Sequence, residues 1–450
     1  MQETGQNTLL RSLGPREAMS LVVGTIIGTG IFLKTATMTQ QLGSMKYVML
    51  AWIFSGILSY AGALTYAELA SRLPKSGGEY AILNHTYGTL FGFLFGWMRF
   101  WIGSPGSIAA YGVAVATFLA GLFSTDLIPG GTKTIAVFFI ALFSLINCFH
   151  VSQGARVQTF LTILKAALIF GLVAGVFLWG TPTLHNPLET SEAGPGSILS
   201  AFGLAMIAAL WAFDGWNNLP MVGGEIRDPQ KNIPLALGLG MLIVIGLYLL
   251  VNWAYFHVLT LEQIQNANSS AHKDALPVAT LAAQTFLGRW GIPALSVAFV
   301  ISSLGAMNGS ILTCARVPFA MAQDGLFWKK LGQAHAVTQV PVWSIVVQAL
   351  IAIALALSGT FDQLTDYVVV ASWAFYVLVT ASIFIIRKNH PTLDTSFKVP
   401  GYPVVPLLFI IAGAFLIGNS LYRNPFEGFI GAAIICAGIP VYFFIQRRRY

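Results

Sequence analysis

The sequence predicts an all-α membrane protein with twelve transmembrane helices. Apolar residues make up 56% of the 450 positions, and charged residues make up only 9%. A soluble chain of this length needs far more charge to cover its surface, so most of these side chains must face lipid. The chain also contains twelve apolar runs of spanning length, and two of these runs are broken near their middles by Gly or Asp.

Each apolar run is long enough for a helix that crosses a bilayer, which takes about 20 residues. The runs lie near residues 17–39, 47–70, 88–121, 134–150, 158–180, 197–221, 233–257, 290–320, 341–358, 364–386, 404–421 and 427–446. The runs at 88–121 and 290–320 exceed the bilayer thickness, which fits tilted helices or helices that extend past the membrane. None of the segments between the runs has room for a soluble domain.

Positive charge is unevenly distributed among the segments that link the runs. With the N-terminus inside, fifteen of the 24 Lys and Arg residues fall in inner segments, six in outer segments and three within runs. Cytoplasmic loops carry such an excess, so both termini are predicted to be cytoplasmic, in a multi-pass protein of the plasma or inner membrane. This topology accounts for the net charge of +7, and no nucleic-acid partner is predicted.

The first run contains a stretch that disfavours a continuous helix. Residues 24–32 read GTIIGTGIF, and a Gly within a helix costs roughly 1 kcal/mol relative to Ala. Gly28 and Gly30, on either side of Thr29, therefore favour local unwinding. Close packing of helices through small residues is the alternative explanation for these glycines.

The sixth run contains a charged residue near its middle. Residues 210–218 read LWAFDGWNN, and an Asp at the centre of a membrane helix costs about 2.5–3.5 kcal/mol. Asp214 beside Gly215 therefore predicts a second interruption. The two interruptions lie five runs apart, each in the first helix of one half of the chain. This arrangement is typical of inverted-repeat transporters and favours a binding site over simple packing.

Unwinding leaves backbone groups without partners inside the helix, and a membrane protein tolerates them only where they line a cavity or meet a ligand. The free N–H groups at residues 29–31 lie at the positive end of a half-helix and suit a carboxylate. The free carbonyl groups around Ile26, and around Trp211 and Ala212, suit an ammonium group. A zwitterionic α-amino acid presents both groups side by side, so the predicted ligand is an amino acid.

Further motifs accompany the two interruptions. They are residues 66–69 (YAEL) and 74–80 (PKSGGEY) after the second run, 223–225 (GGE) beyond the sixth, and 308–310 (NGS) with Arg316 in the eighth. The whole pattern resembles the L-type amino-acid transporters of the amino acid–polyamine–organocation superfamily, over nearly the full chain. It is most similar to bacterial members that exchange small neutral amino acids such as serine, threonine and alanine.

The resemblance implies a five-plus-five inverted-repeat core of the LeuT-like kind, with broken helices 1 and 6 and two additional helices. Residues 1–16 would form a cytoplasmic N-terminus, 17–180 the first repeat and 197–386 the second. Residues 387–450 would form helices 11 and 12 and a cytoplasmic C-terminus. The resemblance also implies sodium-independent, obligatory exchange by alternating access around a site at the membrane midplane.

The resemblance further assigns roles within the predicted site. The substrate carboxylate would bind at Thr29 and Gly30, and Trp211 would act as an aromatic gate over the substrate. The amino group would bind at the carbonyl-bearing positions of both interruptions, and Asn217 would lie near the pocket. The full predicted set of substrate-binding residues is Ile26, Ile27, Gly28, Thr29, Gly30, Trp211, Ala212, Asp214 and Asn217.

Lys165 is a lone charge inside the fifth run, about 10 Å along that helix at 1.5 Å per residue. A lysine that extends its ammonium group to the inner membrane surface is one explanation. The resemblance instead places this lysine beside the first helix, near Gly24. There the ammonium group would take the role that a bound sodium ion has in related coupled transporters. This second explanation favours sodium independence.

Four further charged side chains have roles that the sequence leaves open. Arg99 and Arg316 are predicted near the inner ends of the third and eighth helices. For both, a structural salt bridge or an extension to the membrane surface is favoured over contact with substrate. Glu225 and Asp228 fall in a cytoplasmic loop, where an ion pair that closes a gate is an open alternative.

Several partners and function classes are excluded or disfavoured. The eukaryotic relatives join a glycoprotein heavy chain through a cysteine between helices 3 and 4, whereas residues 124–133 contain no cysteine, so no disulfide-linked heavy chain is expected. The chain has no HExxH motif, nucleophile elbow or phosphate-binding loop, so no enzyme activity, metal, cofactor or ATP is expected. A cation-coupled symporter, or a transporter of cationic or larger neutral amino acids, remains the alternative. A membrane-embedded enzyme or a channel is disfavoured.

Overall fold

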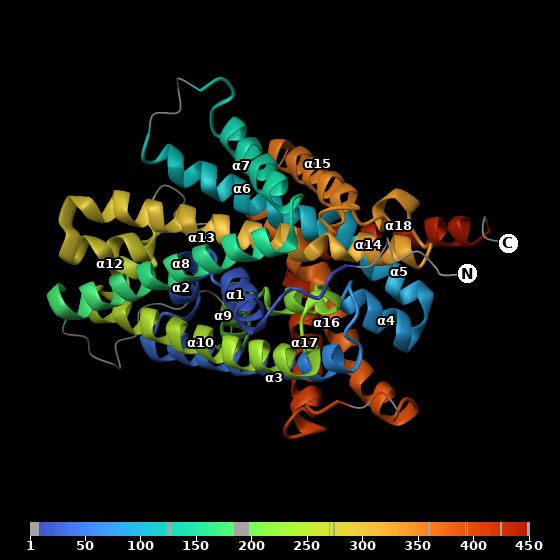
Figure 1. The fold of residues 1–450 in the computed structure, drawn as a ribbon. Coiled ribbons are helices and arrows are strands. Elements are labelled where there is room, and N and C mark those ends of the chain that lie inside the picture. The colour runs from blue at the N-terminus through green and yellow to red at the C-terminus, as the bar shows by residue number, and fades with distance from the viewer. Residues whose placement is uncertain are drawn as a thin grey trace.

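The computed structural model of the chain describes residues 9–123, 128–183, 198–269, 271–272, 275–358, 361–391, 393, 395–423 and 425–447. These residues form a bundle of helices joined mostly by short turns (Figure 1). In this described part, the only strand-like pairings are two isolated bridges, Leu13 with Ile226 and Ser76 with Val222. The predicted all-α architecture is therefore confirmed for the described residues.

The helices follow one another in two groups along the chain. The first half contains α1 (Pro15–Ile26), α2 (Gly30–Leu42), α3 (Met45–Arg72), α4 (Glu79–Tyr87), α5 (Thr89–Met98), η1 (Arg99–Gly103), α6 (Ser104–Ala120), α7 (Gly131–Asn147) and α8 (Val151–Trp179). The second half contains α9 (Ile198–Ala212), η2 (Trp216–Met221), η3 (Gly223–Glu225), α10 (Pro229–Val258), α11 (Leu261–Gln265), α12 (Val278–Leu287), η4 (Gly288–Trp290), α13 (Gly291–Cys314), α14 (Arg316–Gln323), η5 (Lys329–Gly332), α15 (Val342–Ser358), α16 (Phe361–Asn389), α17 (Val404–Arg423) and α18 (Pro425–Arg447).

Seven helical segments of the described chain are long and apolar enough to cross a membrane, and four more apolar helices are shorter. The seven segments are Pro15–Leu42, Met45–Arg72, Thr89–Ala120, Val151–Trp179, Pro229–Val258, Val278–Gln323 and Phe429–Arg447. The chain is thus a multi-pass membrane protein. Each predicted run lies mainly within one helix or within consecutive helices, but the total of twelve spans and the two inverted repeats stay predictions.

The broken first helix lies at the centre of the bundle. In both Pro15–Leu42 and Val278–Gln323, 83% of the most apolar stretch is buried, against 17% for Phe429–Arg447 at the C-terminal end. The first half-helix, α1, packs against α8, α10 and α13, while the second, α2, packs against α9 (Figure 1). This central position surrounds the interruption between α1 and α2 with protein, where exposed backbone groups can be satisfied.

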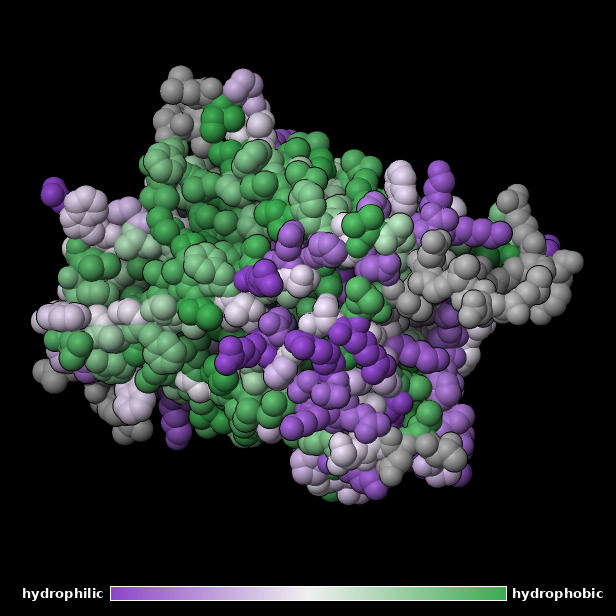
Figure 2. Space-filling model, in the orientation of Figure 1, coloured by the Kyte–Doolittle hydropathy of each residue, from purple (hydrophilic) through white to green (hydrophobic). Residues whose placement is uncertain are grey.

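The outer surface of the bundle is suited to lipid. Figure 2 shows hydrophobic side chains over much of the visible face, with hydrophilic side chains gathered toward the end where α4 lies. On α8, Phe160, Ile163 and Phe170 are 65%, 65% and 55% exposed. Contiguous apolar surface of this kind is rare on soluble proteins, so it supports insertion in a bilayer.

The segment before α1 and the end of α18 lie on the same side of the molecule in Figure 1. This agrees with an even number of crossings, while the cytoplasmic location of the termini stays a prediction. Of the predicted cysteine-free loop at 124–133, residues 124–127 lie outside the described residues. The same is true of residues 1–8 in the predicted N-terminal tail and of residues 184–197, which lie between the two predicted repeats and include the first residue of the second.

Candidate functional site

The first helix is interrupted at residues 27–29, between the end of α1 and the start of α2. Ile27 has extended backbone angles, φ −70° and ψ 91°, which end α1 one residue before Gly28. The chain turns helical again at Gly30, with Thr29 as the capping residue of α2. The break therefore leaves free carbonyl groups on one side and free N–H groups on the other.

The second interruption spans residues 213–215, between α9 and the short 3₁₀ helix η2. Gly215 has a φ of +123°, which favours glycine. A Cβ atom at this position would also lie 2.9 Å from the backbone carbon of Thr25. Gly215 is thus required both for its conformation and for close contact with α1.

The two interruptions lie against each other. The hydroxyl of Thr25 donates to the carbonyl oxygen of Gly215 at 3.0 Å. A Cβ atom built on Gly30 would lie 2.7 Å from the Cβ atom of Ala212 and 3.1 Å from the ring of Trp211. Two segments that are 190 residues apart in sequence therefore form one site, and glycine at both breaks makes this approach possible.

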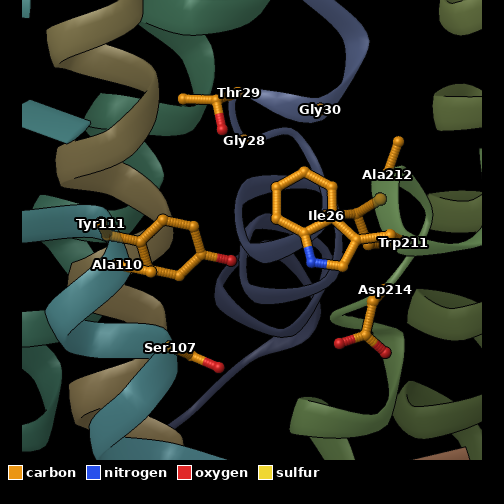
Figure 3. Close-up of a pocket in the computed structure, with 10 residues that line it drawn as sticks. All are labelled: Ile26, Gly28, Thr29, Gly30, Ser107, Ala110, Tyr111, Trp211, Ala212 and Asp214. Carbon is orange, nitrogen blue, oxygen red and sulfur yellow. The ribbon is translucent and has the colours of Figure 1, made fainter. Parts of the chain in front are cut away.

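A cavity of about 40 Å³ lies between the two interruptions (Figure 3). That volume holds only a few water molecules, so the site is nearly closed in this conformation. Its lining includes seven of the predicted residues, which are Ile26, Gly28, Thr29, Gly30, Trp211, Ala212 and Asp214. The buried hydroxyl of Thr29 has no hydrogen-bond partner in the described part of the chain, which leaves it available to a ligand.

Three lining residues come from α6 and were not predicted: Ser107, Ala110 and Tyr111. Figure 3 shows Tyr111 opposite Trp211, and Ser107 opposite Asp214. The spacing of three and four residues places all three side chains on one face of α6. In the sequence, the feature that could have indicated these lining residues is a tyrosine and a serine on one face of an apolar run.

The carbonyl groups that the breaks release have partners from other helices. The hydroxyl of Tyr248, on α10, lies 3.0 Å from the carbonyl oxygens of both Ile26 and Ala212. The hydroxyl of Ser302, on α13, donates to the carbonyl oxygens of Ile27 and Gly28, each at 3.1 Å. These contacts replace intrahelical hydrogen bonds that the membrane interior cannot supply.

Lys165 lies on α8 with its side chain directed into the bundle. Its Nζ atom donates to the carbonyl oxygens of Gly24 at 2.8 Å, Ile27 at 2.6 Å and Ser302 at 3.0 Å, and the residue is 1% exposed. An extension to the inner membrane surface, one of the two predicted explanations, is therefore wrong. The contact with Gly24 matches the other explanation, and it joins α8 and α13 to the end of α1.

Two of the predicted binding residues, Ile27 and Asn217, do not line the cavity. The carbonyl oxygen of Ile27 faces Lys165 and Ser302 instead. Asn217 lies behind Asp214, where its Nδ2 atom donates to the hydroxyl of Tyr376 at 3.0 Å. That hydroxyl lies 3.0 Å from Oδ1 of Asp214, so Asn217 is linked to the cavity through Tyr376.

The ring of Trp211 closes one side of the cavity and carries a cation on its face. The Nζ atom of Lys34, on α2, lies 4.6 Å from the centre of this ring. A cation–π contact of this kind contributes about 0.5–2 kcal/mol, depending on its exposure to solvent. Lys34 therefore helps to hold the predicted gate in its closed position.

Arg99 and Arg316 differ in their surroundings. Arg316 forms a buried ion pair with Glu225, with nitrogen–oxygen distances of 2.7 and 2.9 Å, as a structural salt bridge requires. Arg99 is 4% exposed and donates to Oδ1 of Asn218 at 3.2 Å and to the sulfur of Cys314 at 3.3 Å. Because Arg99 is buried, an extension to the membrane surface is wrong, and the ion pairs found among the described residues do not include Arg99.

Comparisons with known proteins show which family the chain resembles over its length. The family model for amino acid permeases matches residues 13–445. The chain is 32% identical to the serine/threonine exchanger SteT of Bacillus subtilis, over 99% of both chains. It is 30% identical to the human cystine/glutamate transporter, over 97% of this chain and 84% of the relative. It is also 29% identical to the human b(0,+)-type amino acid transporter 1, over 100% of this chain and 91% of the relative.

These relatives are named as transporters or exchangers, which points to a transporter and not an enzyme. The described residues also contain no group of three or more His, Cys, Asp or Glu side chains that could hold a metal ion. The matched family model covers almost the whole chain, including both helix interruptions. The chain belongs to the amino acid permease family.

Proposed function

We propose that the chain exchanges small neutral L-amino acids across the cell membrane, independently of sodium, by alternating access around the cavity between the two helix interruptions. The observation that carries this proposal is that both interruptions border one small cavity. The first interruption provides the N–H end of α2 and the carbonyl end of α1, and the second provides the carbonyl end of α9. An α-amino acid is the ligand that matches both ends at once.

The carboxylate of the substrate would bind at the start of α2. The N–H groups of Thr29 and Gly30 lie at the positive end of this 13-residue helix, and the Thr29 hydroxyl is free to donate. The ammonium group would bind at the carbonyl oxygens of Ile26 and Ala212. All α-amino acids share the carboxylate and the ammonium group. These backbone contacts therefore give affinity without selecting among substrate side chains.

Selection among side chains would fall to the walls of the cavity. The rings of Trp211 and Tyr111 face each other across it, and Ala110 lies beside Tyr111 (Figure 3). Two large rings around a small cavity leave room for a short side chain. The relative from Bacillus subtilis is named for serine and threonine, which supports the same size class.

Sodium independence is proposed from Lys165. Its ammonium group contacts carbonyl oxygens of Gly24 and Ile27, the kind of oxygen ligands that a sodium ion would need. Because the ammonium group of Lys165 already contacts these carbonyl oxygens, a bound sodium ion is not needed there. No disulfide-linked heavy chain is proposed either, although one relative is named as a small subunit.

A second candidate is transport of cationic amino acids, because the carboxyl group of Asp214 lines the cavity. A carboxylate in the part of the cavity that holds the substrate side chain would attract the ammonium or guanidinium group of that side chain. The relative named as a b(0,+)-type transporter is similar over the whole chain. Cation-coupled symport remains the alternative transport mode.

The test is counterflow in proteoliposomes that contain the purified protein and are loaded with serine. Labelled serine, alanine and threonine should enter loaded vesicles rapidly and empty vesicles only slightly. Uptake should persist when sodium is replaced by choline. Strict dependence on sodium, or equal uptake by empty vesicles, would favour symport, and a preference for arginine would favour the second candidate.

A further inference from the structure

A buried carboxyl group lies next to the proposed site but outside its cavity. Glu79 is the first residue of α4 and is completely buried. Its Oε1 atom accepts a hydrogen bond from the hydroxyl of Tyr66 at 3.0 Å. Its Oε2 atom has no hydrogen-bond partner among the described residues. Buried polar atoms without partners are rare in folded proteins, so this oxygen requires an explanation.

The nearest explanation involves Asn217, whose side chain lies next to the Glu79 carboxyl group. The Oδ1 atom of Asn217 is also buried and also has no partner in the described part of the chain. Carbonyl and ionised carboxylate oxygens only accept hydrogen bonds, so these two cannot satisfy each other. A single proton on Oε2 of Glu79 would let it donate to Asn217 and would satisfy both atoms.

The same proton would fix the direction of a hydrogen-bond chain that reaches the cavity. With Glu79 protonated, the amide nitrogen of Asn217 donates to the hydroxyl of Tyr376 at 3.0 Å. That hydroxyl then donates its own proton to Oδ1 of Asp214, at 3.0 Å. The Asp214 carboxylate is thereby satisfied by a neutral donor.

Loss of the proton would reverse this chain. The amide of Asn217 would turn over, so that its nitrogen donates to the ionised Glu79 and its oxygen faces Tyr376. The hydroxyl of Tyr376 would then donate to Asn217 and no longer to Asp214. The Asp214 carboxylate, which lines the cavity, would lose its side-chain donor, keep only the backbone donor of Gly215, and become available to bind a cation.

The charges around Glu79 make both states accessible. The ionisable side chains that face it from other elements are Tyr66 of α3, Arg99 of η1, Tyr376 of α16 and Asp214 at the second interruption. Arg316 of α14 is paired with Glu225, and Asp324, directly after α14, accepts a hydrogen bond from Tyr80 of α4. The neighbouring elements α5 and η2 contain no ionisable residue. Arg99, which has no ion-pair partner among the described residues, thus faces the carboxyl groups of Glu79 and Asp214. A proton on one of these two carboxyl groups leaves one negative charge to balance the positive charge of Arg99.

We infer that Glu79 is a proton-binding site that sets the orientation of Asn217 and thereby controls whether Asp214 can bind a cationic substrate. This inference rests on the proposed amino-acid site. Glu79 lies in the segment between the second and third predicted spans, and burial raises the pKa of its carboxyl group to about 7. The proton is therefore bound below neutral pH and released above it, within the range that a cell membrane meets.

The expected effect is a change of selectivity with pH. At about pH 6 roughly a tenth of Glu79 is ionised, and at about pH 8 roughly nine tenths is ionised, for a pKa of about 7. In proteoliposomes, the ratio of arginine exchange to serine exchange should rise about tenfold between these two pH values. Arginine keeps its side-chain charge across this range, so the change reports on the protein.

The variant that tests the inference is Glu79→Gln. Its amide oxygen can accept from Tyr66 and its amide nitrogen can donate to Asn217, as the protonated acid does. The ratio of arginine to serine exchange should then stay low and equal at both pH values. The matched control is Glu262→Gln, which removes an exposed carboxylate on α11 and should keep the full pH response. An unchanged ratio in the wild type, or a full response in Glu79→Gln, would overturn the inference.

Infrared difference spectroscopy gives a second measurement that does not depend on transport. The C=O stretch of a protonated buried carboxyl group should be present at about pH 6, lost at about pH 8 and absent from Glu79→Gln. Should Glu79→Gln fail to fold, Tyr66→Phe removes a donor to the ionised form and should shift the titration to higher pH. No exchange of any amino acid at either pH would defeat the proposed function, whereas a wild type without the infrared titration would defeat the proton site.

Discussion

The hydroxyl group of Tyr248 lies 3.0 Å from the carbonyl oxygen of Ile26, at the point where α1 ends. The carbonyl oxygen of Ala212, where α9 ends, lies at the same distance from this hydroxyl. A phenol has one proton to donate, so two acceptors compete for it. Tyr248 thus joins the two interruptions and leaves one carbonyl group in need of a donor, which the ammonium group of an amino acid can supply.

Removal of this hydroxyl in Tyr248→Phe should lower both stability and transport. The variant leaves two buried carbonyl groups without their donor, which costs about 1–3 kcal/mol. Serine exchange in proteoliposomes should fall about tenfold or more, and the Tm in detergent should decrease. The matched control is Tyr255→Phe, two turns along the same helix, because the buried hydroxyl of Tyr255 has no partner in the described chain. Equal losses in the two variants would contradict a special role for Tyr248.

Loss of the Lys165 ammonium group, in Lys165→Met, should abolish exchange. Three carbonyl oxygens, from Gly24, Ile27 and Ser302, would lose a charged donor, and hydrogen bonds to charged groups contribute about 1.5–3 kcal/mol. The connection between α8 and the end of α1 would then be lost. Serine counterflow and thermal unfolding measure the two effects. Lys46→Met, at an exposed position, is the control, and near-normal exchange by Lys165→Met would remove the proposed role.

A bulky side chain at position 30 should prevent substrate binding without unfolding the protein. In Gly30→Leu the Cβ atom alone would lie 2.7 Å from the Cβ atom of Ala212, and the rest of the side chain would enter the cavity. Serine binding and exchange should both be lost, while size-exclusion chromatography shows a monodisperse protein. Gly238→Leu on α10 is the matched control, because a Cβ atom at this position meets no other atom within 4 Å. Wild-type exchange by Gly30→Leu would place the substrate elsewhere.

The sequence alone identified the interruptions because they break rules that hold elsewhere in the membrane. A Gly-Thr-Gly stretch and an Asp at mid-span are unfavourable unless they serve a site, so Gly28, Gly30 and Asp214 stand out. Seven of the nine predicted binding residues line one cavity as a result. Lys165 stood out for the same reason, as a charge within an apolar run.

The remaining parts of the site depend on packing that a single sequence does not reveal. Tyr111 and Tyr248 lie in apolar runs where tyrosine is common, and only the contact of α6 and α10 with α1 gives them a role. Asn217 is close to Asp214 in sequence, but the turn of η2 directs its side chain toward Tyr376. The direction of a long side chain is likewise set by neighbouring helices, which is why Arg99 points inward to Asn218.

Truncation of the aromatic gate, in Trp211→Ala, should change both rate and selectivity. The indole ring fills space that a larger substrate side chain needs, and it also closes the cavity against water. Exchange of alanine and serine should fall about tenfold or more, while the rate for leucine relative to serine should rise. Trp253→Ala on α10, at a site that is 59% exposed to the surroundings, is the control. Unchanged selectivity in Trp211→Ala would mean that residues other than Trp211 limit the size of the substrate side chain.

The variant Asp214→Asn should distinguish a site for neutral amino acids from a site for cationic amino acids. If the substrate is held mainly by backbone groups at the two breaks, serine still binds, because the carbonyl of Ala212 and the N–H groups of α2 are unchanged. Among the described residues that line the cavity, only Asp214 carries a full negative charge, so affinity for arginine is expected to come from its carboxylate. Competition by arginine against labelled serine should therefore be weak in the wild type at about pH 6, stronger at about pH 8, and lost at both values in Asp214→Asn.

The matched control is Asp228→Asn, at an exposed position at the start of α10, and it should keep the wild-type pattern. Strong arginine competition in the wild type at both pH values, abolished in Asp214→Asn, would make the cationic candidate the correct one, because the carboxylate would then be available whatever the state of Glu79.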